Sequence, residues 1–166
     1  MRGGRGGPVR PRRAAARVRQ RRQPTDAGQV ASLFLYPGPG RRALPAYGLA
    51  SDTAIISALA NDVGPEVIFS RQIAAFGRQD DIAIGLSTSG NSENLVRAFE
   101  TASQRGLLTV GLAGYSGGKM AEIDSIDYLF VAPSTSVHRI QEAQTTVYNL
   151  LWELTLEALG GRAVTR

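Results

Sequence analysis

The 166-residue sequence predicts one α/β domain, a parallel sheet flanked by helices on both faces. Short apolar runs of strand length recur along the chain, and the segments of about 10–15 residues between them have helical apolar spacing. Strands that alternate with helices imply right-handed crossovers and parallel neighbours. Apolar residues make up 43% of the chain, enough for one core, and the absence of cysteine excludes disulfides and thiolate chemistry.

The first predicted elements are short. Pro45–Ser51 predicts a strand, and a helix over Thr53–Asn61 follows with Asp52 as its N-cap. Residues Glu66–Phe76 have a helical apolar pattern. The uninterrupted apolar run Ile82–Leu86 predicts a parallel strand that is buried on both faces.

The second half continues the alternation. Apolar spacing predicts a helix from near Glu93, and Leu107–Leu112 and Tyr128–Val131 predict two more strands. A long last helix is predicted over His138–Leu159. Its apolar residues cover more than one side, which is typical of a buried core helix or of a helix in a subunit interface.

The most informative segment is the hexapeptide Ser87–Ser92, which connects the strand Ile82–Leu86 to the helix beginning near Glu93 and holds four hydroxyls. Open N–H groups and the dipole at a helix N-terminus bind anions, and hydroxyls add donors without charge. An ordinary helix cap at Asn91 or Ser92 would need one such residue. No Lys follows the glycine and no G-x-G-x-x-G is present, so the loop is neither a Walker loop nor a dinucleotide loop. We predict phosphate binding here.

The segment GLSTSGNSENLVRA resembles the phosphate loop of sugar isomerase (SIS) domains. Three further stretches resemble the phosphoheptose isomerase family in order and spacing, Ala58–Ile73, Thr109–Ala121 and Val137–Leu154. The resemblance runs from about Thr25 to Leu159 and implies a flavodoxin-like three-layer fold and a phosphorylated sugar as ligand. The substrate-binding residues that it implies are Ser87, Thr88, Ser89, Ser92, Asn61, Asp62 and Gln141.

The N-terminal residues 1–23 differ in composition from the rest. They hold nine of the chain's 19 basic residues and no acid, so residues 24–166, with ten basic and fourteen acidic residues, carry a formal charge of −4. A segment rich in Arg, Gly and Pro cannot fold alone and is a nucleic-acid-binding arm or an accident of translation.

The family resemblance favours an out-of-frame translation of residues 1–23. Its members carry a Gly-Asn-Gly-Gly-Ser loop where this chain has Arg19–Gln23, and CGG-CAA-CGG-CGG-CAG-C, which encodes Arg-Gln-Arg-Arg-Gln, encodes that loop when read one nucleotide later. We therefore predict a disordered, out-of-frame tail over residues 1–23, an N-terminally incomplete SIS domain over 24–160, a short tail over 161–166, and no nucleic-acid partner. Sequencing the gene across this junction tests the hypothesis, and an intact frame with other codons would contradict it.

The resemblance implies an aldose–ketose isomerase, a reaction that needs a base and an acid near two adjacent carbons. The family's Glu and C-terminal His fall at Leu33 and Asn149, and a further zinc-binding His falls at Gln29. Of the zinc ligands in some members only Gln141 remains. Leucine and amides do not transfer protons at useful pH, and amides bind zinc poorly. The catalytic residues are therefore unknown, and we expect no metal or other cofactor.

Other polar residues leave alternatives open. His138 is a solvated or capping residue, or it is catalytic. Asp62 contacts the sugar or serves as a replacement base, and Asn61 caps its helix or contacts the sugar. Glu142 can also face the site, but adjacent helix residues diverge by about 100°, so it and Gln141 cannot both point inward.

The resemblance places the last helix in a subunit interface, so we expect a homo-oligomer, a tetramer or dimer. Two functions stay open. One is a sugar-phosphate isomerase that uses unusual residues; the other is a non-catalytic oligomeric adaptor of the replication-initiator-associating type, which shares the Asn at the His position. The sequence has no run of 18 apolar residues and no secretory signal, which favours a cytoplasmic protein without a membrane partner.

Overall fold

The computed structural model describes residues 16–19 and 24–160. They form one sheet of five parallel strands in the order β2-β1-β3-β4-β5. This order is that of flavodoxin-like sheets and confirms the predicted fold class. The strands are β1 (Ala16–Arg19), β2 (Tyr47–Gly48), β3 (Ile82–Leu86), β4 (Leu108–Gly114) and β5 (Tyr128–Ala132).

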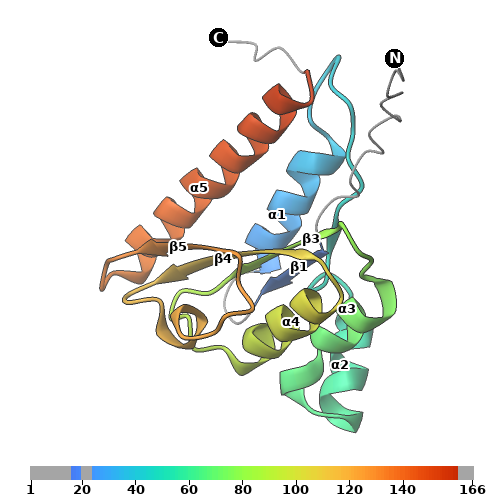
Figure 1. The fold of residues 1–166 in the computed structure, drawn as a ribbon, viewed down its shortest axis with the longest axis vertical. Helices are drawn as coiled ribbons and strands as arrows, with labels where there is room; N and C mark the ends of the chain where they lie inside the picture. The colour runs from blue at the N-terminus through green and yellow to red at the C-terminus, as the bar shows by residue number, and fades with distance from the viewer. Residues whose placement is uncertain (1–15, 20–23, 161–166) are drawn as a thin grey trace, which may run out of the picture.

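Helices cover both faces of the sheet (Figure 1). Helices α1 (Pro24–Leu35) and α5 (Val137–Ala158) lie on one face. Helices α2 (Thr53–Asp62), α3 (Ser70–Phe76) and α4 (Glu93–Gln104) lie on the other. The predicted three layers are therefore present.

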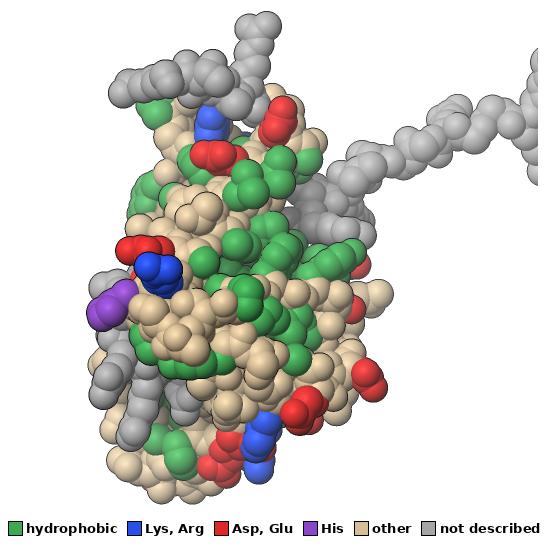
Figure 2. All heavy atoms as spheres, turned by 90° about the vertical axis from the view of Figure 1, so that its left-hand side faces the viewer, with side chains coloured by type: hydrophobic (Ala, Val, Ile, Leu, Met, Phe, Trp, Pro, Cys, Tyr) green, Lys and Arg blue, Asp and Glu red, His purple; other side chains and the backbone are tan. Residues whose placement is uncertain are grey.

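The outer side of α5 is partly apolar. Leu150 and Leu154 are each 52% exposed, and they are four residues apart on one stripe of the helix. Strand β5 pairs with β4 at the edge of the sheet and exposes Phe130 and Val131. Figure 2 looks onto the side of the molecule where α5 and β5 lie in Figure 1, and hydrophobic side chains gather there in a patch.

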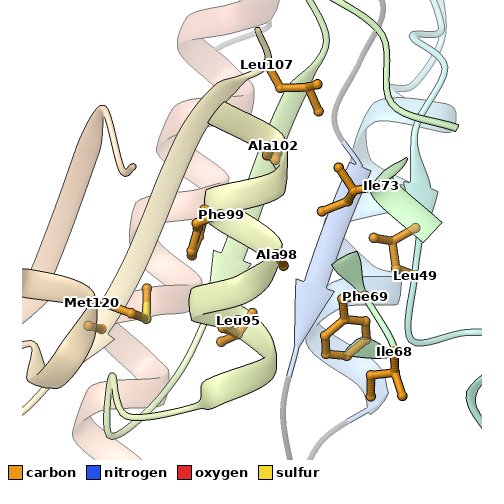
Figure 3. Packing of buried hydrophobic residues seen from close by; sticks show 12 residues of the cluster. Leu49, Ile68, Phe69, Ile73, Leu95, Ala98, Phe99, Ala102, Leu107 and Met120 are labelled. Atoms are coloured by element: carbon orange, nitrogen blue, oxygen red, sulfur yellow. The ribbon is translucent and has the colours of Figure 1, made fainter. Parts of the chain in front are cut away.

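The sheet has a separate apolar core on each face. On the α4 side, Leu95 and Phe99 of α4 pack in one cluster with Phe69 and Ile73 from the segment around α3 (Figure 3). Each such side chain contributes about 1.5–3 kcal/mol when fully buried. On the other side, α1 and α5 contribute to a second cluster, in which Tyr148 is almost fully buried.

Most predicted elements are confirmed. Strand β3 has the predicted bounds and α4 begins at the predicted Glu93, whereas β4, β5 and α5 differ from the prediction by one or two residues at their ends, where boundaries are soft. Asp52 caps α2 as predicted, because its Oδ1 accepts hydrogen bonds from the N–H groups of Ala54 (3.0 Å) and Ile55 (3.1 Å). The strand predicted over Pro45–Ser51 is shorter, only β2.

The helix predicted over Glu66–Phe76 is interrupted. A 3₁₀ turn, η1 (Pro65–Val67), precedes α3, and the two are separate elements. The hydroxyl of Ser70 donates to the carbonyl of Val67 at 3.2 Å, so this carbonyl is satisfied outside a regular helix.

The expectation for residues 1–23 needs one correction. Ala16–Arg19 form β1, between β2 and β3. Without a strand there, facing backbone groups of β2 and β3 would lie unpaired, and ladder hydrogen bonds require no particular side chains. The other predicted tail residues, 1–15, 20–23 and 161–166, lie outside the described residues. An ordered strand together with an ordered helix within residues 1–23 would contradict the reading-frame hypothesis. The structure contains the strand, β1. Sequencing of the gene remains the test of the hypothesis.

Candidate phosphate-binding site

The loop Ser87–Ser92 lies at the carboxyl end of β3, where open parallel sheets bind their ligands. The N–H of Ser87 donates to the carbonyl of Leu112 at 2.9 Å, so the ladder between β3 and β4 extends into the first residue of the loop. Helix α4 begins directly after the loop. A rigid strand on one side and a helix on the other thus hold this segment.

The loop serines form a hydrogen-bonded network. Ser87 and Ser92 are each only 5% exposed, and their hydroxyl oxygens lie 3.2 Å apart. The Ser87 hydroxyl accepts from the N–H of Gly90 at 2.9 Å, and the Ser89 hydroxyl accepts from the N–H of Asn91 at 3.3 Å. Thr88 and Ser89 are half-buried at the surface of the loop. The structure therefore brings the four predicted hydroxyl residues into one compact turn.

The first N–H groups of α4 are open. Among the described residues, nothing accepts a hydrogen bond from the N–H of Ser92, Glu93 or Asn94, whereas the next two N–H groups along the helix donate to the carbonyl of Ser92. Ser92 occupies the N-cap position, but its side chain makes no cap hydrogen bond. The interpretation as an ordinary capped helix therefore does not account for this end, which has the donors and the dipole of an anion site.

A second loop, which leads into η2 (Gly118–Ala121), braces the first. Gly90 has φ +70°, and a Cβ atom there would collide with the carbonyl oxygen of Gly117. The N–H of Lys119 donates to Oδ1 of Asn91 at 3.0 Å. Asn91, one of the two predicted caps, thus joins the two loops and does not cap α4.

Helix α5 holds the loop from behind through a residue that sequence reasoning missed. Gln144 is 4% exposed, and its Nε2 donates to the carbonyls of Ser87 (2.9 Å) and Leu112 (3.2 Å). The sequence does contain a signal for a buried Gln144. This polar residue lies four residues after Ile140 and three residues before Val147, so it falls within the apolar stripe of the helix. A polar side chain at such a position is buried and must find partners.

Charged side chains lie at the start of α4. Nζ of Lys119 lies 3.0 Å from Oε2 of Glu93, and Nε of Arg97 lies 3.6 Å from Oε1 of Glu93. The Lys119 ammonium, which donates a hydrogen bond to this carboxylate, and secondarily the Arg97 guanidinium hold the pKa of Glu93 below its ordinary value. Glu93 is therefore ionised at neutral pH.

Gln141 lies near the loop on α5. The preceding residue, Ile140, and the carbonyl of Thr88 both lie against Gly114, so this turn of α5 is next to the loop. Gln141 is half-buried and Glu142 is exposed, as expected for adjacent helix residues that diverge. Direct contact of Gln141 with a sugar remains a prediction.

Asn61 and Asp62 are exposed at the end of α2, which packs against η1. The N–H groups of Val63 and Gly64 both donate to the carbonyl of Leu59, so the backbone ends this helix and the predicted cap role of Asn61 is wrong. In the part of the chain that the structure describes, neither side chain forms a hydrogen bond or ion pair. Their contact with a sugar stays a prediction.

The resemblance matches three positions, Leu33, Asn149 and Gln29, to the family's proton-transfer and zinc-binding residues, and each of these side chains has packing or hydrogen-bond partners within the protein. Leu33 packs against the apolar cluster between α1 and α5. Nδ2 of Asn149 donates to the carbonyl of Thr145 at 2.8 Å, and Oε1 of Gln29 accepts from the Tyr148 hydroxyl at 3.1 Å. His138 is exposed at the start of α5. Residues 16–19 and 24–160 contain no group of three or more His, Cys, Asp or Glu side chains placed to hold a metal.

Relatives in sequence and two solved structures are phosphoheptose isomerases, although no family model matches the sequence. The phosphoheptose isomerase of Aneurinibacillus thermoaerophilus is 42% identical over 133 residues, which are 80% of this chain and 65% of that protein. The structure of a phosphoheptose isomerase from Francisella tularensis has a TM-score of 0.81 at 29% identity and covers 87% of this chain and 77% of that one. The structure of the phosphoheptose isomerase from Neisseria gonorrhoeae has a TM-score of 0.75 at 30% identity and covers 86% of this chain and 74% of that one.

The chain spans slightly less than two thirds of the length of the Aneurinibacillus relative. Over that span, the sequence identity and the parallel three-layer fold agree with each other and with the resemblance of the phosphate loop. The chain therefore belongs to the phosphoheptose isomerase family.

Proposed function

We propose that this protein binds a phosphorylated sugar, with the phosphate on the loop Ser87–Ser92 and the N-terminus of α4. The observation that carries this proposal is the row of open N–H groups at Ser92, Glu93 and Asn94 beside a turn of hydroxyls. Each charge-assisted hydrogen bond to a phosphate contributes about 1.5–3 kcal/mol. The relatives are named for a phosphoheptose, so sedoheptulose 7-phosphate is the first ligand to test.

Replacing Ser87 and Ser89 together by alanine should weaken phosphate binding at least tenfold. The change removes two hydroxyl donors and the acceptors that now hold the N–H groups of Gly90 and Asn91. Titration calorimetry with inorganic phosphate and with sedoheptulose 7-phosphate measures the effect. Ser103→Ala, at an exposed residue near the end of α4, is the matched control and should leave both affinities unchanged. An unaltered affinity in the double variant would move the site elsewhere.

We further propose that heptose-phosphate isomerase activity is low or absent. An apolar side chain stands at Leu33, and Asn149 uses its amide within its own helix, so neither can exchange a proton with a substrate. Loss of a general acid or base lowers a rate by about 10²–10⁴. The second candidate function, a non-catalytic oligomeric adaptor, is favoured by the same two residues.

Turnover of sedoheptulose 7-phosphate by the full in-frame protein should therefore be close to background. Leu33→Glu together with Asn149→His should raise it, and Asn149→His alone should not, because the reaction needs both an acid and a base. A coupled assay for the isomerised product measures this. Robust turnover without any substitution would contradict the proposal, and Asp62 would then be the first base to test, by Asp62→Asn, which should abolish turnover and leave phosphate affinity intact.

We propose that the protein is a homo-oligomer, a dimer or tetramer, which uses the apolar outer stripe of α5. Large exposed apolar patches mark interaction surfaces in soluble proteins, and hydrophobic side chains gather in a patch on this side of the molecule (Figure 2). Across the described residues, no helix has the length and apolar character for spanning a membrane. The family resemblance places this helix in a subunit interface, so a second copy of the chain is the proposed cover for this stripe.

Replacing Leu150 and Leu154 by aspartate should shift the molar mass in light scattering toward that of one chain. Like charges on both copies would face each other where apolar side chains had packed. Glu153→Gln, on the same exposed turn of α5, is the control and should leave the mass unchanged. A wild-type protein that is already monomeric at micromolar concentration would contradict the proposal.

A further inference from the structure

The proposed phosphate site contains an acidic residue in an unfavourable place. Glu93 is the first residue of α4, and its own N–H is one of the open donors. A carboxylate here stabilises the helix by its interaction with the dipole, but it repels a bound phosphate, because like charges in partly exposed sites interact over several ångströms. An anion site of this composition works only if the charge of Glu93 is compensated.

Two cations surround Glu93, and they are not equivalent. Arg97 is shared between two carboxylates, since its Nε lies 3.6 Å from Oε1 of Glu93 and its Nη1 lies 3.9 Å from Oε1 of Glu66. Lys119, the only lysine of the sequence, has a single acidic partner among the described residues, at 3.0 Å, and donates a hydrogen bond to it. Lys119 is therefore the principal counter-charge of Glu93.

The backbone at Lys119 is fixed to the phosphate loop itself. Its N–H donates to Oδ1 of Asn91 at 3.0 Å, and the N–H of Met120 donates to the carbonyl of Gly90 at 3.0 Å. The ammonium reaches from this braced segment across to the start of α4. The lysine and the anion-binding turn are thus parts of one hydrogen-bonded unit.

We propose that Lys119 is a positioning residue for phosphate binding: it holds and neutralises the Glu93 carboxylate, so that the open N–H groups of α4 meet the anion without net repulsion. Lys119 acts through Glu93 and does not itself contact the phosphate. The inference rests on the proposed phosphate site and adds a residue that determines how strongly that site binds a dianion.

Calorimetric titration with inorganic phosphate at low ionic strength tests this in five proteins: wild type, Lys119→Met, Glu93→Gln, the double variant Lys119→Met/Glu93→Gln, and Lys119→Arg. Lys119→Met should weaken binding about three- to tenfold, the scale of one uncompensated charge near a dianion in a partly solvated site. The double variant should bind within about twofold of wild type, because without the carboxylate the lysine has nothing to compensate. Lys119→Arg, which keeps the charge, should also stay within about twofold.

Two controls separate this role from a structural one. Arg71→Met removes an exposed positive charge on α3 and should leave phosphate affinity unchanged. In Lys119→Met, the pKa of Glu93 measured by nuclear magnetic resonance should rise toward its ordinary value, which a loss of local packing alone would not require.

Three results would overturn the proposal. If Lys119→Met and the double variant are equally weak, the lysine contacts the phosphate directly. If Lys119→Met binds like wild type, the carboxylate needs no compensation, and the phosphate site itself stands. If wild type does not bind phosphate or a sugar phosphate at all, the proposed function fails as well.

Discussion

Replacing Gly90 by alanine should abolish phosphate binding and lower the free energy of unfolding by about 3 kcal/mol. Gly90 has φ +70°, a conformation that costs an L-residue free energy, and the added Cβ would collide with the backbone carbonyl of Gly117. Backbone cannot rotate away as a side chain can, so the loop and the segment leading into η2 must separate. Separation breaks the hydrogen bond from Lys119 to Asn91.

Urea denaturation and phosphate titration of Gly90→Ala measure both effects. Gly28→Ala is the matched control, because Gly28 lies within α1 and a Cβ there meets nothing within 4 Å. That control should leave binding intact and raise stability by about 0.5–1 kcal/mol, the difference in helix propensity between the two residues. If Gly90→Ala has the stability and the phosphate affinity of wild type, the loop Ser87–Ser92 and the segment leading into η2 do not touch.

Gln144→Leu should have the second largest effect, a loss of about 1–3 kcal/mol in the free energy of unfolding together with weaker phosphate binding. The side chain keeps its size but no longer donates to the buried carbonyl of Ser87, which is left without a partner among the described residues, whereas the carbonyl of Leu112 still accepts from the N–H of Ser87. An unsatisfied buried acceptor costs about 1–3 kcal/mol. Because Ser87 starts the phosphate loop, its displacement also moves the hydroxyl network.

Gln104→Leu makes the same chemical change at an exposed residue at the end of α4 and should alter stability by less than about 0.5 kcal/mol. Thermal unfolding of both variants, with phosphate affinity measured in parallel, compares the buried and the exposed amide. Equal stability of the two variants would mean that the hydrogen bonds of Gln144 contribute nothing.

The elements around the phosphate loop could be predicted because their signals are local. An apolar run without interruption defines β3, and the spacing of Leu95 and Phe99 defines α4. Their order along the chain places the loop Ser87–Ser92 at the ligand edge of a parallel sheet. Prediction was weaker where the local signal was short, as for β2 and the interrupted helix at η1, where a serine hydroxyl satisfies a backbone carbonyl.

By itself, the sequence determined the fold class and the family, and it predicted a phosphate loop at Ser87–Ser92 and the loss of the family's usual proton-transfer side chains at Leu33 and Asn149. Only the tertiary structure decided which groups surround that loop. Gln144 reaches Ser87 across 57 residues of sequence, and Lys119 reaches Glu93 across 26. Such contacts depend on how helices and loops pack against the sheet, and no periodicity within one segment encodes the position of a neighbour from another. For the same reason, β1 enters the sheet although its own composition predicts a disordered tail: backbone hydrogen bonding between two strands, and not side-chain pattern, places it there.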